Sequence, residues 1–240
     1  MVALTGDARL DQPGGPAVLD TERLGVRAVN ERLRALPPGS AVTVANPAGR
    51  HNLAVGLDAD VSVLIDGPAG YYAGGLGQGA SITVNGPAGW GAGENLMSGS
   101  VRVRGDASQS AAASAHGGLV IVDGHASLRA GISLKGATLA VAGDAGPFCG
   151  FMAQAGTILI GGDAGDALGD SLYEAVIYVA GTIRGLGADA QVEELSGADV
   201  AAVRALVKRT GFDHIDPEKV TRVASARRLY HFDTRSHDAY

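Results

Sequence analysis

Aliphatic residues recur in pairs along the middle of this chain, with one residue between the two members of each pair. Each pair follows the previous one by 19 residues: Ile82/Val84, Val101/Val103, Val120/Val122, Leu139/Val141, Ile158/Ile160 and Ile177/Val179. Residues two apart face the same side of a strand, so each pair predicts a short strand with one buried face. The fixed period predicts that these strands belong to stacked, equivalent units.

Glycines mark the same register. One begins each unit: Gly67, Gly86, Gly105, Gly124, Gly143, Gly162 and Gly181. Units this short cannot hold two helices, and their glycine content disfavours a helix of any kind. We therefore predict an all-β solenoid, a right-handed parallel β-helix with 19-residue coils. A left-handed β-helix is the poorer alternative because its hexapeptide spacing is missing, and the polysaccharide-lyase helices have longer, irregular coils.

The segments on either side of the repeat each predict one helix. A capping residue, Asp20 or Thr21, begins a helix to about residue 36, where a Pro-Pro-Gly run stops it. A Ser-x-x-Asp capping box begins a second helix over residues 196–209, which we expect at the far end of the stack or along its side. The chain then divides into an N-terminal arm with a capping helix (1–40), the β-helix (41–195) and a C-terminal helix with a basic, aromatic tail (196–240).

The outward positions of the predicted strands change character along the chain. Early strands carry Ser81, Thr83, Ser100 and Arg102, whereas later ones carry Leu119, Ile121, Leu159, Val176 and Tyr178. The later set would leave an apolar stripe in water. Either the C-terminal helix or a partner protein is expected to cover it.

Composition and charge narrow the function classes. The formal net charge is −6, and no basic stripe interleaved with aromatic residues is present, so nucleic-acid binding is not expected. No apolar run is long enough for a membrane span, and the first residues lack the pattern of a secretion signal, so we expect a cytoplasmic protein. Acids dominate residues 144–199 and the chain after residue 201 is basic. This predicts a solvated rim and tail, a tail folded back on the acidic coils, or a docking surface for another subunit.

The candidate catalytic groups do not form a recognisable constellation. The glycine runs at 75–79 and 89–93 lie in register with the repeat and lack the following helix that a nucleotide loop needs. Cys149 falls in a slot held by alanine in other units, so we expect a core thiol. Asp163, Asp166 and Asp170 are expected on one rim as solvated acids. The histidines show no metal-ligand spacing. We expect no catalytic, cofactor-binding or metal site in this chain.

Four units share the pattern G-x-x-G-x-x-x-G: Gly67/Gly70/Gly74, Gly86/Gly89/Gly93, Gly143/Gly146/Gly150 and Gly162/Gly165/Gly169. This pattern resembles the GXGXG domain, the C-terminal β-helix of the glutamate synthase large subunit, which also occurs as a separate subunit of N-methylglutamate synthase. The resemblance spans about residues 40–195. It also extends to the β-helix subunits of formylmethanofuran dehydrogenase and of the formyltransferase/hydrolase complex, although the tail looks more like the glutamate-synthase type.

The resemblance implies a non-catalytic scaffold. Its expected partners are a glutaminase-type amidotransferase-like subunit and a synthase-like subunit that carries FMN and an iron–sulfur cluster, in a complex that makes N-methylglutamate from methylamine and glutamate. No catalytic or cofactor residue of the family maps onto this chain. We expect the partner interface in the tail, at Arg227, Arg228, Tyr230, His231 and Phe232. A stand-alone β-helix enzyme is the alternative of another class.

Overall fold

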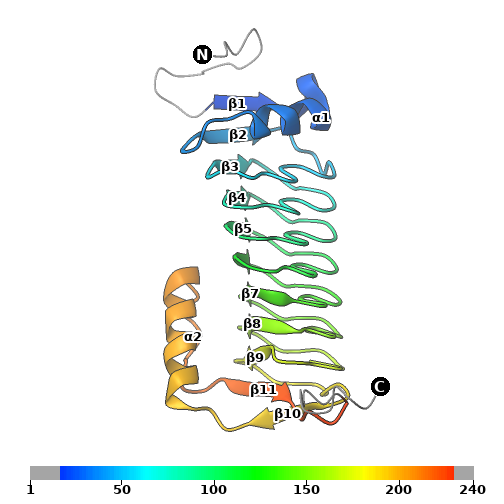
Figure 1. The fold of residues 1–240 in the computed structure, drawn as a ribbon, viewed down its shortest axis with the longest axis vertical. Helices are drawn as coiled ribbons and strands as arrows, with labels where there is room; N and C mark the ends of the chain where they lie inside the picture. The colour runs from blue at the N-terminus through cyan, green and yellow to red at the C-terminus, as the bar shows by residue number, and fades with distance from the viewer. Residues whose placement is uncertain (1–16, 230–240) are drawn as a thin grey trace, which may run out of the picture.

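A stack of parallel strands forms the body of the molecule (Figure 1). The computed structural model describes residues 17–229. In them one 11-stranded sheet has the order β1-β2-β3-β4-β5-β6-β7-β8-β9-β11-β10. The strands are β1 (Ala17–Asp20), β2 (Ala41–Ala45), β3 (Ser62–Ile65), β4 (Ser81–Val84), β5 (Ser100–Val103), β6 (Leu119–Val122), β7 (Lys135–Val141), β8 (Ala155–Ile160), β9 (Val176–Val179), β10 (Ala190–Glu193) and β11 (Thr221–Ser225).

The register of the stack confirms the predicted 19-residue coil. From β3 to β9 each strand pairs in parallel with the next, and partner residues differ by 19, as in the step from Ser62 to Ser81. The exception is Lys135, which pairs with Ala155 across a register shift at the start of β7. A second ladder of isolated bridges runs along the coils from Ala69 to Ile183. The protein is therefore a parallel β-solenoid.

The inside of the solenoid is filled by the residues that the pattern singled out. The paired aliphatic residues of β4 to β9 are all buried. Across the coil from them the core is closed by small side chains, from Ala73 to Ala130, and then by Cys149 and Leu168. Such ladders give each coil the same apolar cross-section, so neighbouring coils bury one another's faces.

Helix α1 (Thr21–Arg34) covers the first open end of the core. The Asp20 side chain caps it by accepting the backbone N–H of Glu22. Val29 and Leu33 of this helix are buried in the core. The buried Asn30 side chain donates to the carbonyl of Asn52 and accepts the N–H of Ala54, which ties α1 to the coil beneath it.

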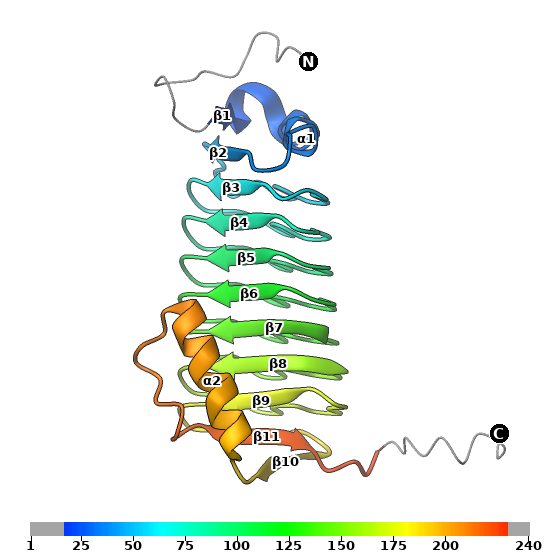
Figure 2. The same cartoon turned by 60° about the vertical axis from the view of Figure 1, so that its left-hand side comes forward.

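Helix α2 (Gly197–Thr210) lies along the side of the stack over β7 to β9, as Figures 1 and 2 show. Its Ser196–Asp199 capping box and its end at Gly211 confirm the prediction. The apolar stripe on the later strands packs against this helix and the segment after it, in a cluster that consists of Leu119, Ile121, Ala140, Leu159, Tyr178, Val203, Phe212, Ile215 and Val220. The C-terminal helix therefore covers the stripe.

The last coils end differently from what the pattern predicted. The repeat weakens after β9, and the chain returns as β11, which pairs antiparallel with both β9 and β10. This reversal closes the far end of the stack. Neither β10 nor β11 carries the 19-residue signal, so the repeat does not predict them. At the other end, Ala17–Asp20, expected to be part of an extended arm, pairs with β2 as a further strand.

Two different constraints explain the recurring glycines. At the unit starts the backbone passes close to the coil before: a Cβ on Gly105 would lie 2.9 Å from the backbone nitrogen of Pro87. At the eighth position the backbone is left-handed, with φ of +68° at Gly74 and +72° at Gly150. Ala112 adopts the same conformation there, with φ of +59°. Close approach thus fixes the first set of glycines, and backbone conformation favours the second.

Candidate functional site

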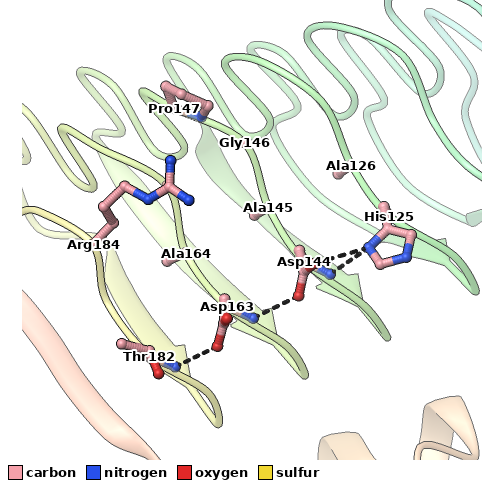
Figure 3. A pocket seen from close by; sticks show the side chains of 11 residues that line it. His125, Ala126, Asp144, Ala145, Gly146, Pro147, Asp163, Ala164, Thr182 and Arg184 are labelled. Atoms are coloured by element: carbon pink, nitrogen blue, oxygen red, sulfur yellow. Dashed lines mark hydrogen bonds and ion pairs between the residues drawn. The ribbon is translucent and has the colours of Figure 1, made fainter.

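A groove of about 620 Å³ runs across one corner of the later coils (Figure 3). The second residue of each coil lines one side of it: His125, Asp144, Asp163 and Thr182 stand one above the other. Arg184 reaches over from the opposite side. Because the groove gathers several titratable groups, their hydrogen bonds decide whether they are available to a ligand.

The side chains of this corner form a ladder of hydrogen bonds between coils. The Asp106 carboxylate accepts the N–H of His125 at 2.8 Å, and the His125 ring nitrogen Nδ1 accepts the N–H of Asp144 at 2.9 Å. Asp144 and Asp163 repeat the pattern, accepting the N–H groups of Asp163 and Thr182 at 2.8 and 2.7 Å. Each side chain thus satisfies a backbone donor of the next coil.

Two earlier coils need no side-chain acceptor at this corner. Pro68 and Pro87 hold the equivalent position, and proline has no N–H to satisfy. In the later coils, Asp144 and Asp163 therefore accept the backbone N–H that a proline at the equivalent position of the next coil would lack. Asp163 was expected to be a solvated acid, and that expectation is incomplete, since its exposed carboxylate also bonds to backbone. Asp170 likewise accepts the hydroxyl of Ser171 and the N–H of Ala188.

Cys149 lies in the core, as the repeat predicted. It is fully buried, and burial raises the pKa of its thiol to about 12. A thiol held in its protonated form inside a packed coil is a poor nucleophile. Its role is to fill the space that alanine fills in other coils.

A polar network fixes α2 and β11 to the end of the sheet. The Tyr178 hydroxyl donates to Asp199 at 2.6 Å, and Arg222 pairs with both Asp199 and Glu193. Burial, followed by the bond to ionised Asp199, raises the pKa of Tyr178 to about 12. Burial alone would raise the pKa of Asp199, but hydrogen bonds from Ser196, Tyr178 and Arg222 outweigh it and hold that pKa well below its usual value. Hydrogen bonds and ion pairs within the network thus hold the charged side chains of Asp199, Arg222 and Glu193 in place.

The described residues offer neither a metal-binding cluster nor a membrane span. Among residues 17–229, no group of three or more His, Cys, Asp or Glu side chains is arranged to hold a metal ion. Neither described helix is both long and apolar enough to span a bilayer.

The base of the predicted tail interface rests on the acidic coils. Arg227 forms an exposed ion pair with Glu174 at 3.1 Å, and the Asp189 carboxylate accepts the backbone N–H groups of Arg228 and Leu229. The tail therefore folds back on the acidic coils up to residue 229, as one of the predicted alternatives has it. Tyr230, His231 and Phe232 lie outside the described residues.

A further surface was not predicted from the sequence. We call it the loop edge: the turn-rich part of each coil, residues 70–80 and their equivalents at 19-residue steps, which Figure 1 shows on the side opposite α2. Large apolar side chains on it are 38–58% exposed: Tyr71, Tyr72, Leu76, Trp90, Met97, Leu128, Phe148, Met152 and Leu186. Exposed apolar side chains gathered on one face are typical of a protein–protein contact surface.

The loop edge begins with a stack of three rings. The His51 and Tyr71 centroids lie 4.2 Å apart, and those of Tyr71 and Trp90 lie 5.1 Å apart, with nearly parallel planes. The backbone beneath them alternates into left-handed conformations, including φ of +61° at Tyr72 and +56° at Leu76. A comparison of the fifth, sixth and tenth residues of each unit would have revealed this surface, whereas strand positions alone do not.

Comparison with known proteins finds a relative of nearly the same length. No protein-family model matches the chain. Protein GlxC of Rhizobium meliloti (strain 1021) is 47% identical to it over 226 residues, which cover 93% of this chain and 99% of that protein. A match of this extent takes in the solenoid and most of its flanking segments.

Proposed function

The chain belongs to the family of Protein GlxC, and we propose that it is a non-catalytic scaffold subunit of a glutamate-synthase-like complex. The complex we favour is N-methylglutamate synthase, which converts methylamine and glutamate to N-methylglutamate and ammonia. The glycine pattern that resembles the GXGXG domain supports this choice, as does the parallel solenoid with 19-residue coils.

The observation that carries the proposal is the loop edge. Its exposed aromatic and aliphatic side chains extend over most of the length of the solenoid, from Tyr71 to Leu186. A monomer gains nothing from such a face in water, whereas a subunit that holds others together needs one. The polar side chains of the corner groove, by contrast, are used for bonds between coils.

The cofactors of the proposed complex belong to its other subunits. An iron–sulfur cluster needs several cysteine ligands, and the single cysteine of this chain, Cys149, is buried in the core. We place FMN and the cluster in a synthase-like partner, and the handling of the nitrogen donor in an amidotransferase-like partner. We further propose that the assembly works in the cytoplasm.

Purification from the native cell tests the proposal. A tagged chain should bring down two larger companions, one of them yellow and showing flavin and iron–sulfur absorbance. A formyltransferase companion would instead indicate a β-helix subunit of the formylmethanofuran dehydrogenase or formyltransferase/hydrolase type. Turnover of an extended substrate by the purified chain alone would indicate a stand-alone β-helix enzyme and would contradict the proposal.

A further inference from the structure

A small pocket opens on the loop edge beside the ring stack. It encloses about 330 Å³ and is lined by Asn52, Val55, Tyr72, Gly75, Leu76, Glu94 and Asn95. Its walls are apolar, apart from two asparagines and one carboxylate. The volume is near the lower limit for ligand pockets, which suits one long side chain better than a free metabolite.

The carboxylate of Glu94 and the ring of Tyr72 share the space left by a missing side chain. A Cβ built on Gly91 would lie 2.6 Å from Glu94 Oε2 and 2.8 Å from Tyr72 Cδ1. Other coils carry a side chain at this position, such as Ser110 and Phe148. Glu94 and Tyr72, which both line the pocket, therefore take up space that a side chain occupies in other coils.

Glu94 carries a carboxylate that the described part of the chain leaves unpaired. No hydrogen bond or ion pair within residues 17–229 involves this carboxylate, although the side chain is half-buried. Burial raises its pKa, because ionisation costs more in this partly buried position than in open water. A partly desolvated carboxylate without a cation is costly, and a cation brought by another molecule would relieve that cost.

Leu76 gives an independent sign that the pocket has a use. It is 58% exposed and has a left-handed backbone, φ +56°. The next coil places Asn95 at the equivalent position with φ +53°, and asparagine adopts this conformation more easily than leucine. An exposed leucine in a strained conformation benefits neither the coil nor its solubility, so its apolar side chain is better explained by contact with another protein.

We propose that this pocket receives a lysine or arginine side chain from a partner subunit, whose apolar stem lies between Tyr72 and Leu76 and whose cation meets Glu94. This inference rests on the proposed scaffold function. The net charge of −6 favours a basic partner segment over an acidic one. Apolar walls with a charge at the end match the two parts of a lysine or arginine side chain.

The test uses the assembly purified from its native cell. Glu94→Gln keeps the shape and removes the charge, and Leu76→Asn copies the neighbouring coil. Each should raise the concentration at which the assembly dissociates by at least about tenfold, measured over a dilution series by size exclusion. The matched control is Asp58→Asn, which removes an exposed charge at the same end of the solenoid and should leave that concentration within about twofold.

The isolated variants give a second readout. Because the Glu94 carboxylate is unpaired within residues 17–229 and Leu76 is strained, both variants should melt at the wild-type temperature or above it. A lower melting temperature would indicate a structural role and overturn the inference, as would wild-type assembly by Glu94→Gln. Self-association of the isolated chain that depends on Glu94 would overturn it too, since the occupant would then be a second copy. Failure of the wild-type chain to bring down any partner would contradict the proposed function itself.

Discussion

The two halves of the sheet have the same inside and different outsides. In β4, residues alternate between exposed or half-buried and buried, whereas every residue of β6 is buried. The inward pairs are aliphatic in both halves, and from β3 onward the coils share a 19-residue step. The difference is α2, which packs on the later strands and leaves β2 to β5 uncovered. The repeat thus determines the interior, and the covering segment determines which outward residues are apolar.

Arg102 marks the border between the halves. Its guanidinium bonds to both carboxylate oxygens of Asp123 and to the carbonyl of Thr210, the last residue of α2. A cation at a helix C-terminus satisfies carbonyls that have no partner within the helix. Arg102, at an outward position of β5, therefore binds the C-terminal end of α2. The apolar stripe that α2 covers begins one strand later, on β6.

The largest expected effect comes from outward residues of the two halves. Leu159→Ala removes a fully buried side chain beneath α2 and should lower the free energy of unfolding by about 2–5 kcal/mol. Thr83→Ala, at an outward position of the uncovered half, should change it by less than about 1 kcal/mol. Unfolding in guanidinium chloride, followed by circular dichroism, measures both. Equal losses of unfolding free energy in the two variants would contradict the claim that α2 covers the outward residues of only the later strands.

Substitutions at equivalent interior positions should lower the stability of the protein by similar amounts in both halves. Gly74→Val and Gly150→Val place a β-branched residue at left-handed positions, where the new Cβ would meet Val101 or Ile177 at 2.8 or 2.7 Å. Each should cost about 1–3 kcal/mol. Gly150→Ala should cost less, since Ala112 occupies the equivalent position. Thermal melts compare the three variants, and tolerance of valine in one half would show that the interior is not uniform.

Acid should loosen the covered half first. Hydrogen bonds hold the pKa of Asp199 below its value in the unfolded chain, so its stabilising contribution is complete at neutral pH and is lost as the pH falls below about 4. Asp199→Asn should cost about 1–2 kcal/mol at pH 7 and make the stability of the α2 contact less dependent on acid. Hydrogen exchange of α2 amides from pH 7 to pH 3 measures this. An unchanged pH profile in the variant would show that another group controls the contact.

The smallest effect on stability is expected where the tail leaves the solenoid. The pair of Arg227 and Glu174 is exposed on both sides, so replacing Arg227 and Arg228 by glutamate should change stability by less than about 1 kcal/mol. The same double variant should weaken assembly if the tail docks a partner. Size exclusion of the complex at ordinary salt measures that, and an intact complex would exclude the tail from the interface.

The sequence was sufficient to predict the repeating coils and the two helices that flank them. The coil length, the inward pairs, both helices and the core position of Cys149 were predicted from spacing and capping residues. Strands β10 and β11 were not, because they pair antiparallel outside the period. The roles of Asp163 and Asp170 were missed because acids that bond to the backbone of the next coil look like solvated acids in the sequence.

The candidate surfaces were predicted less completely than the fold. The tail was noticed through its charge, and its anchoring on Asp189 came from contacts that the sequence does not show. The loop edge was missed because its exposed apolar residues belong to no strand or helix. Two of them, Tyr72 and Leu76, are exposed on a left-handed backbone. Short-range patterns of polarity do not predict such a conformation.

The scaffold role is tested most directly by mixing the purified companion subunits with and without this chain and following sedimentation velocity. With the chain, we predict one species that contains both companions and carries the flavin absorbance. Without it, we predict that the companions sediment separately. A complete assembly formed in the absence of this chain would contradict the account.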